Sequence, residues 1–407
     1  MGLPGLDYGE VSSLMARVTG GFHALLHSCS MMPGVARSEV LPTGIHDILG
    51  RDWIVFRLKA LDEKIDPALD LILRIITEAD FSDLKRLRDL SLEMKNDLDS
   101  SLAPSGHAYA SGFSSRRFSR ACAVNELWSG LDQILFAHKL IDLDVSGISA
   151  KLKNIQNMFA KAGVLINITG SADTEREIGK RFGAFGPPRP RNPASQDREN
   201  FFALSELKTG EVFASPSVQV GFASISLKAS PYGSPLQAAE LVLSHQVSTG
   251  ALWEEIRMKG GAYGAFVTPD HLEGPFSFAT YRDPNPLRSL DAFTSVIRDA
   301  SQGKDNNLEK AVIGTYARET RPRTPMEKGL ADFLRFLSGI EDAYRSRRLK
   351  DIVAVSEEQM DAARSRLANE IRATNGVVHA NPVIIAGKID AEKAAAHLGV
   401  KVQTLPV

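Results

Sequence analysis

The sequence predicts an α+β protein of two homologous domains, each with an antiparallel-rich sheet and helices packed on one face. Three observations support this fold class. The length of 407 residues suits two domains of ordinary size. The string Arg-x-x-Gly-Gly occurs twice, from Arg17 and from Arg257, at an offset of 257 − 17 = 240 residues. Segments with strand-like and helix-like apolar periods follow both strings in the same order, which indicates one duplicated fold.

The first copy begins with two predicted strands, over 22–28 and 53–60, in which apolar residues recur with a period of two. Asp66 before Pro67 favours a helix start, with Asp66 as the N-cap. Ser82 is expected to cap the next helix, whose apolar residues from Leu84 to Leu98 keep a period of 3.6. A further strand is predicted over 164–169.

The second copy repeats this order. Strands are predicted over 263–268 and 275–282, followed by helices near 287–300 and 307–318 and a buried strand over 383–386. Strands over 211–227 and a helix over 235–247 precede Arg257.

The first copy is expected to lack the start of the fold. The 240-residue offset places the counterparts of the strands over 211–227 and the helix over 235–247 before, or at, residue 7. We therefore expect this chain to be a piece of a longer protein, with the alternative that the first copy evolved shorter. A sheet without its first strands would expose an unpaired edge and an uncovered face.

These observations divide the chain into three parts. Residues 1–186 form the first domain, which lacks its first strands and helix and includes an associated helical region. Residues 187–197 form a proline-rich, stiff linker. Residues 198–407 form the second, C-terminal domain.

Composition narrows the classes of partner. The hydrophobic fraction of 43% and the charged fraction of 24% are typical of globular proteins, and the net charge of −1 gives no reason to expect nucleic acid or an anionic membrane as a partner. No apolar stretch approaches the ~20 residues of a membrane span. The start of the sequence lacks the pattern of a signal peptide, so a cytoplasmic location is expected. Cys29 and Cys122 could pair, but two cysteines in this length are expected to be free thiols.

The strings from Leu252 to Gly264 (LWEEIRMKGGAYG) and from Phe276 to Pro284 (FSFATYRDP) resemble the C-terminal half of the pitrilysin/insulinase zinc metallopeptidases. Strings around His107 and Trp128 are similar to the presequence-protease and falcilysin branch of that family. The resemblance implies two halves that close around an unfolded peptide, which is expected to dock by strand addition at a sheet edge. It also implies that zinc is bound by the N-terminal half, whereas the C-terminal half supplies an Arg and a Tyr.

Matched residue by residue, this pair is Arg257 and Tyr263, which would support catalysis through substrate and oxyanion contacts. A Tyr hydroxyl can donate to the oxygen that becomes negative during hydrolysis, and a guanidinium can bind a backbone carbonyl. Arg257 is expected to end a helix and Tyr263 to begin a strand, with Gly260 and Gly261 in a tight turn. Without the resemblance, they would be a surface helix residue and a half-buried strand residue. In the first copy, Arg17 corresponds to Arg257, but His23 occupies the position that corresponds to Tyr263.

No zinc site is expected in this chain. The sequence contains neither His-x-x-Glu-His nor its reverse, and Glu240 and His245 do not have the required spacing. His23 and His27 are predicted on a strand, about 13 Å apart, which is too far for one ion. His107 is expected to be a hydrogen-bonded structural residue.

The function that these observations favour is the non-catalytic C-terminal half of a zinc metalloendopeptidase that degrades unfolded peptides, inactive without its zinc-bearing half. The expected partners are that N-terminal catalytic half and the peptide. Two alternatives remain: a stand-alone non-catalytic subunit that partners a zinc-bearing subunit, and a purely structural protein on the same fold.

Overall fold

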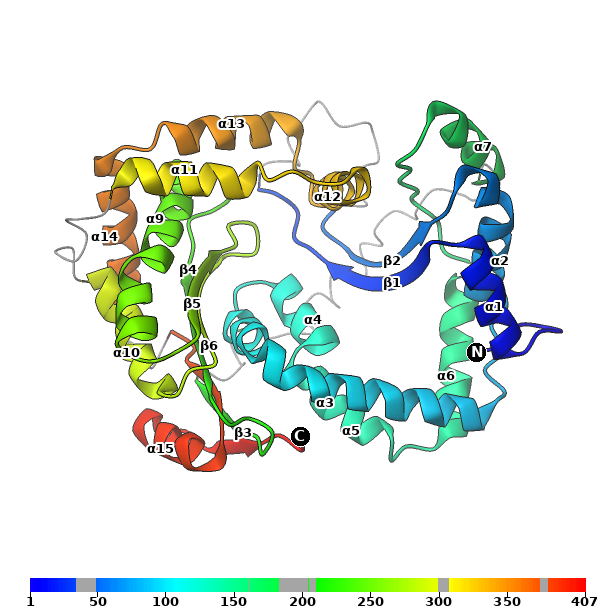
Figure 1. The fold of residues 1–407 in the computed structure, drawn as a ribbon, viewed down its shortest axis with the longest axis horizontal. Helices are drawn as coiled ribbons and strands as arrows, with labels where there is room; N and C mark the ends of the chain where they lie inside the picture. The colour runs from blue at the N-terminus through cyan, green and yellow to red at the C-terminus, as the bar shows by residue number, and fades with distance from the viewer. Residues whose placement is uncertain (34–48, 160, 183–203, 205–209, 299–306, 374–379) are drawn as a thin grey trace.

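The computed structural model describes the chain except residues 34–48, 160, 183–203, 205–209, 299–306 and 374–379. The expected linker over 187–197 lies outside the described residues. The described part contains a two-stranded sheet, a six-stranded sheet and the helices around them (Figure 1). No helix in this part is long and apolar enough to cross a membrane.

The helices, in chain order, are α1 (Tyr8–Val18), the 3₁₀ helix η3 (Asp62–Lys64), α2 (Ile65–Glu78), α3 (Leu84–Ser115), α4 (Arg120–Ser129), α5 (Leu131–Leu140), α6 (Val145–Phe159), α7 (Ala172–Phe182), α9 (Gln237–Thr249), the π-helix η6 (Trp253–Met258), α10 (Pro286–Arg298), α11 (Leu308–Glu319), α12 (Pro325–Leu337), α13 (Asp342–Val353), α14 (Glu357–Ala373) and α15 (Lys388–Leu398). The strands are β1 (Gly21–Ser28), β2 (Asp52–Lys59), β3 (Glu211–Ala214), β4 (Phe222–Lys228), β5 (Gly264–Pro269), β6 (Pro275–Tyr281), β7 (Val383–Ala386) and β8 (Val402–Thr404).

The six-stranded sheet has the strand order β5-β6-β4-β7-β3-β8. The first three pairings are antiparallel, whereas β3 pairs in parallel with both β7 and β8. The strands and helices predicted for the second copy are present, with bounds that differ by about two residues. The short strand β8 and the helices α12 to α15 were not predicted.

Side chains alternate between two buried faces along the strands of this sheet. On β4, Ala223, Ile225 and Leu227 join the larger core, which α9, α10, α14 and α15 cover. This is the helical layer that the sequence predicts. Burial on both faces explains why β4 and β6 are apolar or small at nearly every position.

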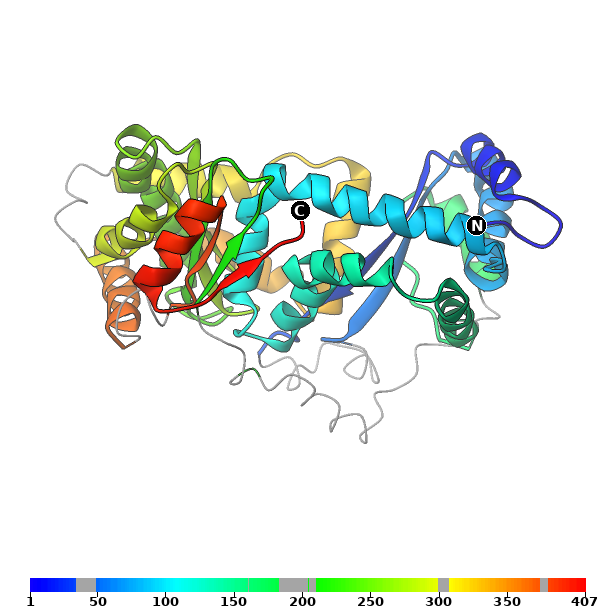
Figure 2. The same cartoon turned by 90° about the horizontal axis from the view of Figure 1, so that it is seen from below.

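The opposite face of the sheet is covered by α3 and α5, which come from the first part of the chain (Figure 2). This second layer adds to the expected architecture. Small residues allow a close approach, since a Cβ built on Gly106 of α3 would overlap the Phe222 ring. The hydroxyl of Ser114 donates to the Asn381 carbonyl oxygen (2.8 Å) and lies 2.9 Å from the Ser226 hydroxyl. The serines on this face are therefore paired rather than left buried without partners.

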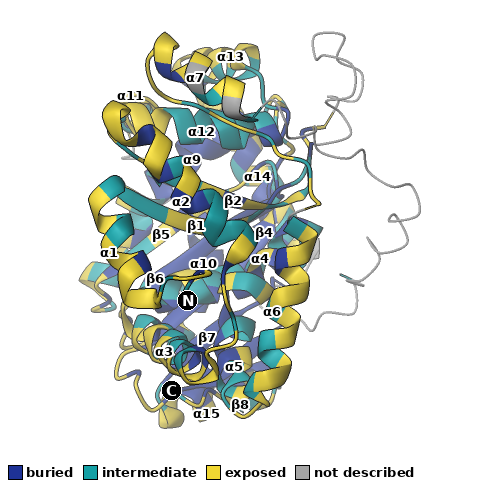
Figure 3. Ribbon diagram, turned by 90° about the vertical axis from the view of Figure 1, so that its right-hand side faces the viewer, coloured by how far each residue is buried: buried dark blue, intermediate teal, exposed yellow. Residues whose placement is uncertain are grey.

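The first copy contains only the antiparallel pair β1–β2, with Gly21 opposite Lys59 and Ser28 opposite Asp52. Figure 3 shows these two strands as mostly intermediate or exposed, unlike the buried six-stranded sheet. Leu26, Ile54 and Phe56 are among the exposed apolar side chains. The expected unpaired edges and uncovered face are thus present in the described part.

Three expectations for the first copy are wrong. Residues 164–169 do not form a strand but run in extended form past α12, where the Asn167 amide donates to the Gly329 carbonyl oxygen (3.4 Å). Helix α2 begins at Ile65, because η3 precedes it, so Asp66 lies in its first turn. Helix α3 is capped by Asp83, which accepts from the Arg86 amide, rather than by Ser82.

Glu273, in the turn between β5 and β6, joins the two parts of the chain. Its carboxylate accepts from the amide and the hydroxyl of Ser30 (both 2.7 Å) and from the hydroxyl of Ser119, the N-cap of α4. The segment that follows β1 and the start of α4 are therefore both fixed to the turn between β5 and β6. Asp52 and Arg120 form a further ion pair between β2 and α4.

Candidate functional site

Arg257 lies in the last turn of η6, and the turn that follows explains its position. The Gly261 amide donates to the Arg257 carbonyl oxygen (3.0 Å), and the Ala262 amide donates to that of Ile256 (3.1 Å). Gly261 has φ +80°, which glycine adopts without strain, and a Cβ on Gly260 would lie 2.5 Å from the Ile256 carbonyl oxygen. The predicted helix end and Gly260–Gly261 turn are confirmed.

Tyr263 follows this turn directly and precedes β5. Its amide is shared between the carbonyl oxygens of Tyr281 (3.1 Å) and Arg282 (3.2 Å), at the end of β6. The side chain is 64% exposed. The backbone of Tyr263 is therefore fixed by the sheet, while its hydroxyl remains accessible.

Arg257 and Tyr263 are brought together in a row of aromatic and cationic side chains. The guanidinium carbon of Arg257 lies 4.0 Å from the ring centre of Trp253 and 5.6 Å from that of Tyr263. The Tyr263 ring meets the Tyr281 ring edge-on at 5.6 Å, and the guanidinium carbon of Arg282 lies 5.4 Å from the Tyr281 ring centre. Such cation–π contacts hold charged side chains in place without neutralising them.

Three residues of this row line an open pocket of about 560 Å³. Arg257, Tyr263 and Arg282 supply its polar groups. Its other walls include Val220, Met258 and Pro284. An open pocket with donor groups and an apolar wall suits a peptide better than a small enclosed ligand.

His107 packs behind the row, on α3. Its ring lies 5.0 Å from the Tyr281 ring and 5.9 Å from the Phe266 ring, and burial lowers its pKa. Its buried Nδ1 has no hydrogen-bond partner within the described residues. Aromatic contacts therefore position His107, whereas a hydrogen bond was predicted; its structural role stays a prediction.

The string around Trp128 contains Glu126, which links the end of α4 to the start of α5. Glu126 is buried, and its carboxylate accepts from the Leu131 amide (2.7 Å) at the start of α5. Burial, with Asp132 nearby, raises the pKa of Glu126 to about 7.

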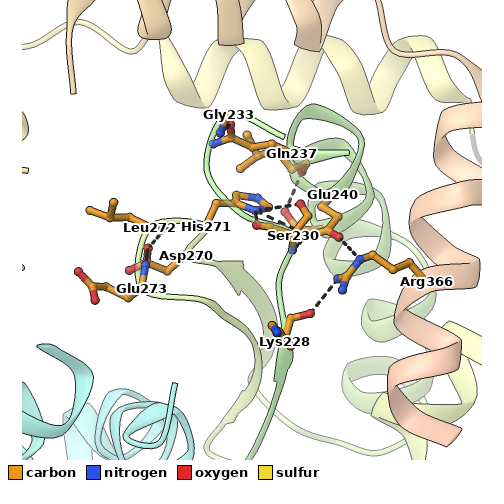
Figure 4. Close-up of polar contacts among 12 residues, drawn as sticks. Lys228, Ser230, Gly233, Gln237, Glu240, Asp270, His271, Leu272, Glu273 and Arg366 are labelled. Atoms are coloured by element: carbon orange, nitrogen blue, oxygen red, sulfur yellow. Dashed lines mark hydrogen bonds and ion pairs between the residues drawn. The ribbon is translucent and has the colours of Figure 1, made fainter. Parts of the chain in front are cut away.

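A buried polar cluster lies at the N-terminal part of α9 (Figure 4). Glu240 is fully buried and accepts from Arg366 Nε (2.6 Å) and from the Ser230 amide (2.9 Å). His271 Nδ1 lies 2.8 Å from the Ser230 carbonyl oxygen, so it carries the proton and donates. Burial lowers the pKa of His271 to about 4. The buried carboxylate of Glu240 therefore forms an ion pair with Arg366.

The described residues contain no group of three or more His, Cys, Asp or Glu side chains that could hold a metal. His23 and His27 lie on β1, as predicted, and His245 packs against Gly314 of α11. The residues of the described part therefore do not fit a zinc ion.

Both cysteines are free thiols. Burial raises the pKa of Cys29 and raises the pKa of Cys122 to about 12.

The resemblance singled out Arg257 and Tyr263, which the structure places side by side, but not the residues that contact them. Trp253 and Arg282 stood in the two quoted strings without an assigned role. An arginine after a strand gives little signal by itself, because only the fold places it beside the turn that precedes another strand.

Two sequence profiles match this chain. The profile of the PreP C-terminal domain matches residues 211–385. The profile of the associated domain of peptidase family M16, subfamily C, matches residues 1–140.

Related proteins and structures agree with these matches. Presequence protease 1, chloroplastic/mitochondrial, from Arabidopsis thaliana is 28% identical over 363 residues, covering 88% of this chain and 32% of that protein. This chain thus spans about a third of the length of that relative. The peptidase M16 inactive domain from Pseudomonas fluorescens is similar in structure, with a TM-score of 0.50 and 14% identity over 95% of this chain and 85% of that one. Pitrilysin gives a TM-score of 0.51 at 13% identity, over 92% of this chain and 37% of pitrilysin.

Proposed function

Since the chain belongs to the presequence protease family, as its C-terminal region, we propose that it is the non-catalytic half of a zinc metalloendopeptidase that degrades unfolded peptides. In this proposal, the half closes over the substrate and supplies Arg257 and Tyr263 to it. Zinc, held by the N-terminal half, would polarise the substrate carbonyl and activate a water molecule.

The observation that carries the proposal is the placement of Arg257 and Tyr263 side by side at an open pocket. Tyr263 can donate its hydroxyl hydrogen to the substrate oxygen that becomes negative, and its fixed backbone reduces the cost of positioning. Arg257 can donate from its planar fork to a substrate carbonyl, since its stacking on Trp253 and Tyr263 leaves its charge available. A purely structural role would not require either polar group to be accessible.

The sheet edge nearest the pair is poorly suited to strand addition. On β5, the Val267 amide donates to the Ser248 hydroxyl (2.9 Å), and Pro269 has no amide hydrogen to offer. The opposite edge is β8, a strand of three residues. We therefore propose that the six-stranded sheet holds peptide through side-chain donors, and that strand addition within this half would use another edge, such as the unpaired edges of β1 and β2.

A mixing experiment tests the proposal. We expect the 407-residue chain alone to contain no zinc and to leave an unstructured peptide uncleaved. Added to the separately produced N-terminal half, it should restore zinc-dependent cleavage. Cleavage by the isolated chain, or no gain on mixing although the halves associate, would contradict the proposal.

The location expected from the sequence, the cytoplasm, stays a prediction. Fractionation of cells that produce the complete protein, followed by immunodetection, would test it.

A further inference from the structure

The pocket beside Tyr263 contains two guanidinium groups, those of Arg257 and Arg282. Its lining, within the described residues, includes no carboxylate. No ion pair or hydrogen bond from either guanidinium to an acidic side chain is found in the described part of the chain. The pocket is therefore a concave surface with two positive charges that the protein does not itself neutralise.

Acidic residues of the same segments are already engaged. Lys259 Nζ lies 3.0 Å from Glu254 Oε1 and 2.6 Å from Glu255 Oε1. Asp283 is buried and does not line the pocket, and its Oδ1 accepts from the Asn285 amide (2.8 Å). These contacts leave the two arginines as the charged groups that face the pocket.

Arg282 has a backbone conformation that its residue type disfavours. Its φ of +49° lies in the left-handed region, which glycine adopts without the steric cost that a side chain brings. The carbonyl oxygen of Arg282 accepts from the Tyr263 amide, a backbone contact that does not depend on the side chain. A strained arginine at an open pocket, where glycine would serve the backbone better, indicates a use for its side chain.

We propose that this pocket binds a carboxylate of the peptide substrate and that Arg282 is the residue that determines this specificity. The inference rests on the proposed function, because it names the substrate group that lies beside the Arg257–Tyr263 pair. A guanidinium presents a planar fork of donors that matches a carboxylate, and Arg257 adds a second positive charge. Both an Asp or Glu side chain and the free C-terminus of a peptide present this group.

A binding experiment on the 407-residue chain tests the proposal and separates these two sources. Four versions of one unstructured, fluorescently labelled peptide would be titrated: with Asp or Asn at one central position, each with a free or an amidated C-terminus. We expect one of the two carboxylates to tighten binding about three- to tenfold at low salt, and the preference to fall at high salt. Loss of the preference on Asp→Asn identifies a side-chain carboxylate, and loss on amidation identifies the C-terminus.

Variants assign the effect to the residue. Arg282→Gln should abolish the preference, while Arg282→Lys, which keeps the charge but not the fork, should retain part of it. Arg321→Gln, at an exposed arginine between α11 and α12, should leave the preference unchanged. Unchanged thermal melting of each variant would show that the fold is intact.

Two results would overturn the inference. Equal binding of all four peptides would contradict the carboxylate subsite, yet leave the proposed function standing. An unchanged preference in Arg282→Gln would remove Arg282 from it. If no peptide bound and mixing with the N-terminal half restored no cleavage, both the subsite and the proposed function would fail.

Discussion

Tyr263 combines a fixed backbone with an exposed side chain. Its amide is held by two carbonyl oxygens at the end of β6. Its ring lies between the Arg257 guanidinium and the Tyr281 ring. In the proposed function, this arrangement would limit the positions of the ring before substrate arrives, which favours a preorganised donor for the transition state.

We expect Tyr263→Phe to lower kcat of the reconstituted peptidase by about 10²–10³-fold, because it removes one donor to the developing negative oxygen. The ring contacts remain, so the melting temperature of the chain and the zinc content of the complex should not change. Steady-state kinetics with a quenched fluorescent peptide would measure the effect. An unchanged kcat would remove Tyr263 from the chemistry.

His271 predicts an acid sensitivity of the C-terminal sheet. Its pKa of about 4 in the folded chain lies below the ordinary value near 6.5, since burial disfavours the charged ring. The unfolded chain therefore takes up a proton as the pH falls below about 6.5, while the folded chain does not. The contribution of His271 to the free energy of unfolding should fall from pH 6.5 to pH 4, by about 1.4 kcal/mol for each pKa unit, whereas the raised pKa of Glu126 contributes with the opposite sign.

Urea unfolding at several pH values would measure this slope. His271→Gln, which cannot take up a proton, should show a shallower slope over the same range. His397→Gln, in the last turn of α15, is the control, because that histidine is exposed. An equal slope in wild type and His271→Gln would contradict the assignment.

At the scale of elements, the contact between α3 and β4 determines how the two parts of the chain are arranged. The face of β4 toward α3 carries Ser224 and Ser226, and α3 presents Gly106 and Ser114. Small side chains on both elements let the helix lie close to the strand. The cost of burying hydroxyl groups is offset by their mutual hydrogen bonds.

Gly106→Ala should destabilise the chain by about 1–3 kcal/mol, although alanine favours helix, because the added methyl overlaps the Phe222 ring. Gly179→Ala on α7 is the matched control: nothing lies within 4 Å of its Cβ position, so the better helix propensity should raise stability slightly. Denaturant unfolding followed by circular dichroism would compare the two. Equal stability of both variants would show that α3 can shift without cost.

At the scale of the whole molecule, the β1–β2 hairpin spans between the C-terminal sheet and the helices α1, α2 and α6 (Figure 1). The end of the hairpin where β1 leads toward β2 is fixed by hydrogen bonds from Ser30 to Glu273, which also accepts from Ser119 of the α4 cap. Backbone hydrogen bonds join the same end to the end of α12. The hairpin is thus held at one end, while its strands lack further strand partners in the described part.

Glu273→Ala should therefore loosen the hairpin without unfolding the six-stranded sheet. We expect faster amide hydrogen exchange over residues 21–33 and 49–59, because the Ser30 amide loses its acceptor. Exchange in β4 and β7 should remain slow, since both strands are buried. Mass spectrometry of the exchanged chain would resolve these segments, and faster exchange throughout would indicate general destabilisation.

The sequence by itself determined the strands β3 to β7 and the helices α9 to α11 of the second copy, and the Gly260–Gly261 turn. Apolar periodicity reports which face of an element is buried, and a glycine pair reports a backbone conformation that other residues disfavour. Both are local properties. The resemblance then directed attention to two residues that local patterns alone would have left as surface positions.

Only the tertiary structure decided the rest. Residues 164–169 have an apolar pattern but form no strand, because a strand requires a ladder with a neighbour and these residues form none in the described part. The cover of α3 over the sheet, the ion pair of Glu240 with Arg366, and the place of Arg282 at the pocket all join residues far apart in the chain. Such contacts depend on how the elements pack, and a single sequence records each partner without recording that they meet.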